Sequence, residues 1–251
     1  MQSKNLYFFV SSVFAGRNEI INMVETGVAN ATVRTGGLNV MINALRLVDD
    51  YYGCWCRFEQ QSGWSKGKGQ PIDDFDSGCK DLNRGYSCLQ MDYPNCDVFG
   101  ETRTNPTDAL YVSPAITGSE TADQIRQACI DNNPMPTSSG PERRCRQDTC
   151  VVESNFVVGL IIQLRQGNFI EDSYQHGNGF EPRSQCLAGG NGGQNGVFET
   201  QCCGTYPDKF PYKTTKDGNP FRGCCGDRTF FVDRHCCKDD SASEVAPVGT
   251  C

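Results

Sequence analysis

Sixteen cysteines in a chain of 251 residues constrain this fold more than any other feature of the sequence. Six of them form three adjacent pairs, Cys202-Cys203, Cys224-Cys225 and Cys236-Cys237. An even number of cysteines at this density predicts a disulfide framework that forms in an oxidising compartment. We therefore expect a secreted, extracellular protein, although the spacing of the cysteines leaves the connectivity of the bridges open.

The charge and hydropathy of the chain exclude several classes of partner. The formal net charge is -7 and the sequence pI is about 4.9, with no basic run. Nucleic-acid binding is therefore not expected, and the acidic balance argues against strong binding to anionic membranes. The mean hydropathy is -0.49. We find no run of about 18 apolar residues, the length that a transmembrane segment needs.

Residues 1–16 form an apolar N-terminal segment with two interpretations. It fits a signal peptide in which Lys4 is the basic region and Val13-Phe14-Ala15 precedes the cleavage site. It also fits a strand that is retained and buried, in its own core or in another subunit. In the second case, the residues that we expect to mediate assembly are Leu6, Tyr7, Phe8, Phe9, Val10 and Phe14.

The spacing of apolar residues predicts helices across the middle of the chain. Residues 17–50 show helical periodicity with a break at Gly36-Gly37, and residues 73–90 and 145–166 predict two long helices. A short helix is expected over 121–133, with Thr121 as its N-cap. Residues 91–120 and 134–144 are predicted to be loops.

The C-terminal third differs in composition from the helical part. Residues 167–200 form a Gly/Asn-rich connector that contains GGNGGQNG. Residues 201–251 form a Cys-rich module, predicted to be irregular or β, with the motifs QCCG, GCCG and HCC. It resembles the short Cys-rich modules of extracellular matrix and adhesive proteins. Its acidic tail, residues 238–251, ends in Cys251, which we expect to pair back onto the body.

The segment from Tyr52 to Tyr86 resembles the active-site region of the secreted phospholipase A2 family. It reads YGCWC and, after an insert, GKGQPIDDFDSGCKDLNRGY. In the family a YGCxC calcium loop leads through G-x-P-x-D-x-x-D into a helix with D-x-C-C-x-x-H-D-x-C-Y. The resemblance implies a mainly α, disulfide-rich fold with a phospholipase A2-like helical domain over residues 17–166. It also implies a Cys56–Cys79 disulfide, whereas Gly78 and Gly85 stand where the family has further cysteines.

On the same pattern the catalytic residues of the family are missing. Leu82 falls at the catalytic His, and Asn83 falls at the neighbouring calcium-binding Asp. Leucine cannot accept a proton, and an amide oxygen offers a calcium ion no negative charge. Residues 57–60 read RFEQ where the family has metal-facing glycines, and Asp148 is the nearest counterpart of the Asp that orients the His. The resemblance therefore implies a scaffold without lipase chemistry, and no cofactor or metal is expected.

The remaining candidate residues are two histidines and one sequon. His176 and His235 are interpreted as surface or turn residues. His235 could also bind a metal together with the adjacent Cys236 and Cys237, although adjacent cysteines without C-x-x-C spacing favour disulfides. Asn30-Ala31-Thr32 is an N-glycosylation sequon.

These features together predict a non-enzymatic secreted structural protein. Its expected partner is a second copy of itself, in an extracellular filament or matrix. The alternative is a secreted calcium-dependent phospholipase A2 or a lipid-binding relative. A receptor-binding or toxin-like module on the same scaffold is a third interpretation, for which the sequence offers no site.

Overall fold

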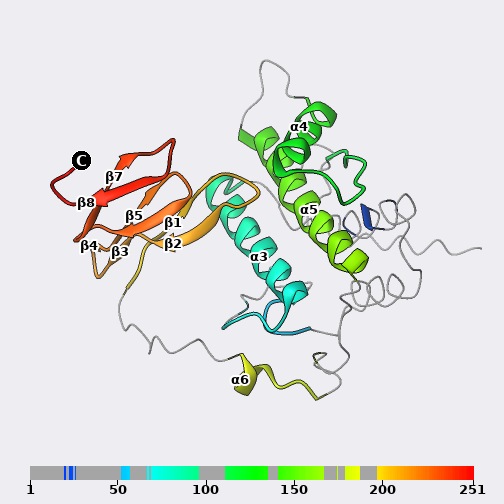
Figure 1. The fold of residues 1–251 in the computed structure, drawn as a ribbon, viewed down its shortest axis with the longest axis horizontal. Helices are drawn as coiled ribbons and strands as arrows, with labels where there is room; N and C mark the ends of the chain where they lie inside the picture. Colours follow the sequence, from blue (N-terminus) through cyan, green and yellow to red (C-terminus); the bar gives the residue numbers. More distant parts are fainter. Residues whose placement is uncertain are drawn as a thin grey trace, which may run out of the picture.

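The structure is a computed structural model that combines three longer helices with small antiparallel sheets (Figure 1). It describes residues 52–56, 67, 69–95, 111–134, 141–166, 174, 179–186 and 197–251, with Ile20, Met23, Val24 and Thr26. The expected assembly residues 6–14, the sequon at Asn30 and His176 lie outside the described residues. The fold is disulfide-rich, as the cysteine count predicts, with seven bridges in the described part.

The helices lie close to their predicted positions, and their ends have identifiable causes. Helix α3 spans Asp74–Asp92, and its N-cap Asp73 accepts a hydrogen bond from the N–H of Asp76. Helix α4 spans Ala122–Asn132 and begins with a capping box between Thr121 and Gln124. Helix α5 spans Pro141–Gln166. The short helix α6 spans Pro182–Gln185 and was not predicted, since it lies in the segment 167–200 that was expected to be a connector.

Helix α5 corrects one predicted boundary. It begins at Pro141, four residues before the predicted start and inside the segment 134–144 that was predicted to be a loop. Proline is well suited to the first turn of a helix, because its missing N–H would have no intrahelical partner there. This proline therefore marks the start of the helix and not the end of a linker.

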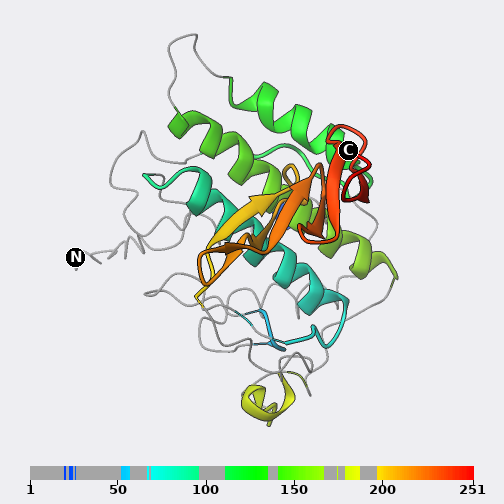
Figure 2. The same ribbon diagram turned by 90° about the vertical axis from the view of Figure 1, so that its left-hand side faces the viewer.

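The hydrophobic core lies mainly between α3 and α5, which pack against each other (Figures 1 and 2). Helix α4 covers another part of α5 and is joined to it by the Cys129–Cys150 disulfide. In the predicted helical segment 17–50, the described residues Ile20, Met23, Val24 and Thr26 are helical, and the first three belong to the same core. The largest buried apolar side chains of the pair α3 and α5 include Leu82, Leu89, Phe156, Leu160 and Ile161.

Two glycines of this helix pair offer a matched test of the packing. A Cβ at Gly85 would lie 2.7 Å from a methyl carbon of Val152, whereas a Cβ at Gly159 would meet nothing within 4 Å. We expect Gly85→Ala to lower the free energy of unfolding by about 1–3 kcal/mol through overpacking. Gly159→Ala should raise it by about 0.5–1 kcal/mol, because alanine loses less backbone entropy in a helix. Denaturant unfolding measures both values, and equal effects would contradict this close approach of α3 to α5.

The C-terminal module consists of four two-stranded antiparallel sheets, each made of strands adjacent in sequence. The strand pairs are β1 Thr200–Cys203 with β2 Phe210–Lys213, β3 Thr215–Lys216 with β4 Asn219–Pro220, β5 Arg222–Cys225 with β6 Arg228–Phe231, and β7 His235–Asp239 with β8 Glu244–Pro247. In the turn between β3 and β4, Asp217 and Gly218 both have positive φ. This is the conformation that an Asp-Gly two-residue hairpin loop favours.

This module buries very little of its own surface. Of residues 197–251, only Cys203, Tyr206 and Cys225 are buried. Two of these three are half-cystines, so apolar burial alone stabilises the module weakly. The cross-links between its strands must therefore provide much of its stability.

The disulfides of the module follow one another in series through the three adjacent cysteine pairs. The bonds are Cys88–Cys202, Cys203–Cys224, Cys225–Cys237 and Cys236–Cys251. Each adjacent pair lies in a strand, namely β1, β5 or β7. Successive side chains of a strand point to opposite faces, so the two cysteines of a pair bond to different neighbours. The expectation that Cys251 pairs back onto the body is met by its bond to Cys236.

The first of these bonds joins the module to α3. Strands β1 and β2 lie beside this helix (Figures 1 and 2). Asp92, the last residue of α3, strengthens the junction by accepting hydrogen bonds from the Tyr206 hydroxyl at 2.8 Å and from Lys209 Nζ at 2.6 Å. The connector before the module is also fixed to the helical part, because Cys186 is bonded to Cys54. The module is therefore held against α3 by the Cys88–Cys202 disulfide and by the two hydrogen bonds to Asp92.

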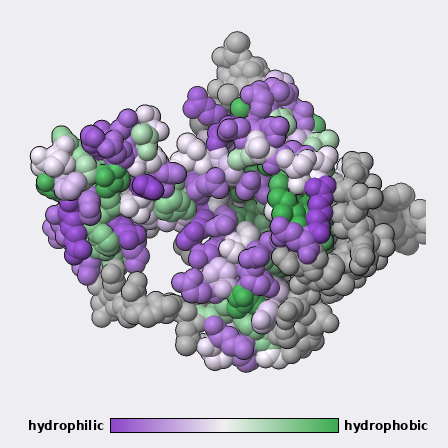
Figure 3. Space-filling view, viewed as in Figure 1, coloured by the Kyte–Doolittle hydropathy of each residue, from purple (hydrophilic) through white to green (hydrophobic). Residues whose placement is uncertain are grey.

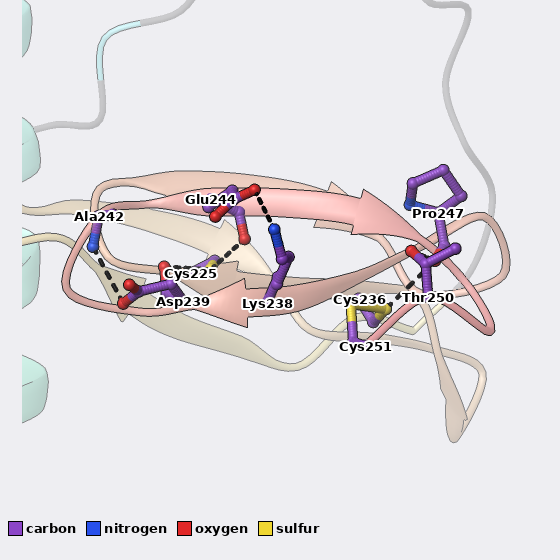
Figure 4. A network of polar contacts seen from close by, with 9 residues as sticks. All are labelled: Cys225, Cys236, Lys238, Asp239, Ala242, Glu244, Pro247, Thr250 and Cys251. Atoms are coloured by element: carbon purple, nitrogen blue, oxygen red, sulfur yellow. Dashed lines mark hydrogen bonds and ion pairs between the residues drawn. A yellow bond between two sulfur atoms is a disulfide. The ribbon is translucent and has the colours of Figure 1, made fainter.

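The acidic tail folds into the β7–β8 hairpin (Figure 4). Lys238 and Glu244 form an ion pair at 2.7 Å across the strands. Asp239 accepts hydrogen bonds from the Ser241 hydroxyl and the Ala242 N–H, and these bonds lower the pKa of its carboxyl group. Thr250 donates to the carbonyl of Pro247 beside the Cys236–Cys251 bond.

No described helix is both long and apolar enough to cross a membrane.

The exposure of the sulfurs predicts the order in which the disulfides are reduced. A thiol must reach a sulfur to break the bond. Cys129 and Cys150 are 0% exposed, whereas Cys251 is exposed and Cys236 is half-buried. Under native conditions with a mild reductant and an alkylating agent, we expect Cys236 and Cys251 to be labelled before Cys129 and Cys150. Peptide mass mapping checks this order, and simultaneous labelling of both pairs would contradict it.

Candidate functional site around helices α3 and α5

The carboxylate of Asp76 holds the loop that resembles a calcium loop. It accepts hydrogen bonds from the backbone N–H groups of Cys54 at 3.0 Å, Trp55 at 2.7 Å and Cys56 at 3.2 Å. A fourth N–H, from Ile72, donates at 3.1 Å. Burial raises the pKa of the Asp76 carboxyl, and these four donors oppose that rise. The loop is therefore organised around a protein carboxylate.

Gly53 makes this close approach possible. Its φ is +56°, and a Cβ at this position would lie 2.5 Å from the carboxyl carbon of Asp76. Any other residue at position 53 would therefore combine a strained backbone with a steric clash. The disulfide implied for Cys56 and Cys79 is present in the structure and fixes the end of the loop to α3.

A second polar centre lies between the helices, where Glu153 of α5 is 0% exposed. Its carboxylate accepts hydrogen bonds from the hydroxyl of Tyr86 at 2.6 Å and from the hydroxyl of Tyr111. The sequence interpretation did not single out Glu153. The available signal was a lone acid within the apolar run of residues 151–161, because a buried charge requires partners.

Asp148, expected as the counterpart of the Asp that orients the catalytic His, belongs to α5. Its carboxylate accepts a hydrogen bond from the hydroxyl of Tyr93 at 2.5 Å, just beyond the C-terminal end of α3. Burial raises the pKa of both groups, and the hydrogen bond adds to the rise for Tyr93 but opposes it for Asp148. The carboxylate that accepts a hydrogen bond from Tyr86 is Glu153, and the assignment of Asp148 as the counterpart of the Asp that orients the His stays a prediction.

Leu82 and Asn83 occupy the positions at which the resemblance places the chemistry. Leu82 is 2% exposed and Asn83 is 4% exposed. The Nδ2 atom of Asn83 is buried without a hydrogen-bond partner. Neither side chain carries a titratable group, so neither can act as a general base.

Leu82 lines a groove of about 370 Å³ between α3, α5 and the loop that joins β1 to β2. We call it the acidic groove, because its charged lining residues in the described part are three carboxylates, Asp74, Asp81 and Asp208. Its apolar lining includes Leu82, Phe156, Leu160 and Ile162. The groove thus offers a partner apolar contacts together with negative charge.

The cysteines near His235 are in disulfides, so they offer no thiolate ligands for a metal site there. Among the described residues Cys225, Cys237 and Asp240 lie close enough to share an ion. However, Cys225 is bonded to Cys237, and Cys236, adjacent to His235, is bonded to Cys251. A disulfide sulfur lacks the charge that binds zinc. His235 itself lies exposed on β7.

Comparisons of the chain with protein-family models, with curated proteins and with solved structures find no match. The similarity to secreted phospholipases A2 thus remains a resemblance carried by the motifs around residues 52–86.

Substituting Asp76 tests whether its carboxylate organises the loop. Asp76→Asn keeps the size of the side chain but removes its charge and one acceptor oxygen, which leaves buried N–H groups unpaired. We expect the free energy of unfolding to fall by roughly 2–4 kcal/mol. Asp74→Asn, at an exposed position in the first turn of the same helix, should cost no more than about 0.5 kcal/mol. Thermal or denaturant unfolding measures both variants, and equal losses would show that the charge of Asp76 has no special role.

Proposed function

We propose that this protein is a non-catalytic extracellular structural protein that assembles with copies of itself. The observation that carries the proposal is the buried Leu82 at the position where the resemblance to phospholipases A2 requires a general base. The surrounding scaffold is nevertheless well built, with Asp76 holding the loop and Glu153 bonded to two tyrosines. A retained scaffold with an inert residue at its centre favours a role in binding or support.

The metal chemistry of such a lipase finds equally little support in these residues. The carboxylate of Asp76 accepts hydrogen bonds from four N–H groups of the chain, so it is occupied by the loop itself and is not free to bind a cation. Asn83 supplies an uncharged amide where a carboxylate would raise calcium affinity. The residues of the loop and of α3 therefore do not fit a calcium-dependent hydrolase.

The cross-links suit a protein that must last outside the cell. Disulfides at this density are typical of oxidising compartments, and they slow unfolding and proteolysis. The module of residues 197–251 depends on them in place of a large core. We propose secretion and an extracellular matrix or filament as the setting, with residues 6–14 as a further expected contact between subunits.

Electron microscopy and sedimentation velocity of the unreduced protein test this proposal. We expect the sedimentation coefficient to rise with concentration and regular assemblies to be visible by negative stain. Release of fatty acid from phospholipid vesicles, measured with calcium and with a chelator, should stay at the level of protein-free vesicles. A chain that remains monomeric at high concentration and releases fatty acid only with calcium would replace the proposal with the lipase alternative.

A further inference from the structure

A second groove, of about 400 Å³, lies between α3 and the C-terminal module. We call it the basic groove, because Arg84 of α3 and Lys213 and Arg222 of the module line it. In the described part no carboxylate lines it, and its other walls are mainly the aromatic rings of Phe210, Tyr212, Phe221 and Phe231. The space-filling view shows an open gap between the module and the helical part, next to the place where they touch (Figure 3).

The cations of the module are oriented by aromatic rings but are not neutralised. The guanidinium of Arg222 lies 4.6 Å from the ring centre of Phe231, and Lys213 Nζ lies 3.7 Å from that of Phe198. Neither residue belongs to an ion pair within the described part of the chain. Arg222 Nε is also buried without an acceptor. A cation–π contact leaves the positive charge available, so the groove suits an anionic partner.

The acidic groove is complementary to the basic groove in charge and similar in size. It is lined by Asp74, Asp81 and Asp208. Asp81 already pairs with Arg84 of the basic groove at 3.6 Å, so Asp74 and Asp208 carry the negative charge that is unpaired within the described part. Each groove also has a partly exposed large apolar residue in its lining, Ile162 at 39% in the acidic groove and Phe231 at 36% in the basic groove. A contact between the two grooves would therefore bury apolar surface as well as pair opposite charges.

We infer that the basic groove binds the acidic groove of a second copy of this chain, an inference that rests on the proposed self-assembly. Copies of a chain with a net charge of -7 repel one another over most of their surface. Lys213 and Arg222 of the basic groove, which are unpaired within the described part, are then the place where two copies attract, and the like-charge repulsion elsewhere fixes their relative position.

The symmetry of the contact decides the form of the assembly. If each contact uses the basic groove of one copy and the acidic groove of the next, every added copy leaves one groove of each kind open. Such a head-to-tail contact extends into a chain. If two copies use both grooves at once, the contact closes as a symmetric pair.

Charge-reversal variants of the unreduced full chain test the contact. Arg222→Glu and the exposed Lys213→Glu reverse a charge in the basic groove, and Asp208→Lys reverses one in the acidic groove. Arg228→Glu and Asp227→Lys, exposed in the β5–β6 hairpin and outside both grooves, are the matched controls. Thermal unfolding of each variant verifies that it is folded. Analytical ultracentrifugation then gives the dissociation constant of self-association for each variant.

We expect each groove variant to raise the dissociation constant at least about tenfold, while the control variants leave it unchanged. An equimolar mixture of Arg222→Glu and Asp208→Lys should associate again, because each chain keeps one native groove that fits the other. If the native chain associates and the groove variants do so equally well, the contact proposed here is wrong and self-assembly stands. If the native chain does not associate at any concentration, both proposals are wrong.

The same variants distinguish a second copy from a foreign anionic polymer. A sulfated polysaccharide such as heparin is the probe, measured by binding at low and high salt. Binding of heparin by a native chain that remains monomeric, together with loss of this binding in Arg222→Glu but not in Arg228→Glu, would assign the basic groove to a foreign polyanion. That result would overturn the contact between two copies.

Discussion

The Cys88–Cys202 disulfide joins two parts of the chain that are stabilised in different ways. The helical part has an apolar core between α3 and α5, so its bridges add to a structure that burial already supports. The C-terminal module has three buried residues, and its hairpins would be marginal as isolated strand pairs. Docking on α3 through this bond and through Asp92 gives the module a rigid support. Both grooves depend on that support, because each is lined by residues of α3 and of the module.

Two buried carboxylates hold segments of the helical part in place through hydrogen bonds, in addition to its apolar packing. Asp76 ties the loop of residues 52–56 to the first turn of α3, and Glu153 ties α5 to two tyrosines. Such groups are costly to bury unless they are hydrogen-bonded, and these are. Leu82, buried in the same helical part, has no titratable group, so this hydrogen-bonded interior has no general base at that position.

Local sequence signals predicted the helices and the β character of the module, whereas long-range contacts were not accessible from them. Thr121 was expected as the N-cap of α4, and the structure confirms it with a capping box to Gln124. The Asp217-Gly218 hairpin was not singled out, although an Asp-Gly pair favours a two-residue hairpin loop. The start of α5 at Pro141 was missed because a proline after a Ser- and Gly-containing stretch also fits a linker. Glu153 and both grooves depend on residues brought together from distant segments, and no local spacing records that juxtaposition. The phospholipase A2-like core remains a prediction.

The serial order of the bridges has a mechanical consequence. From Cys251 a covalent path runs to Cys236, through one peptide bond to Cys237, and onward by the same alternation through residues 225, 224, 203 and 202 to Cys88. A tensile force applied at the C-terminus is therefore carried by disulfides and single peptide bonds, and it reaches α3 without passing through the hairpin loops. The strands between the bridges bear almost none of this load. Pulled from its end, the module cannot lengthen appreciably until a sulfur–sulfur bond breaks, so it acts as an inextensible link attached to a helix.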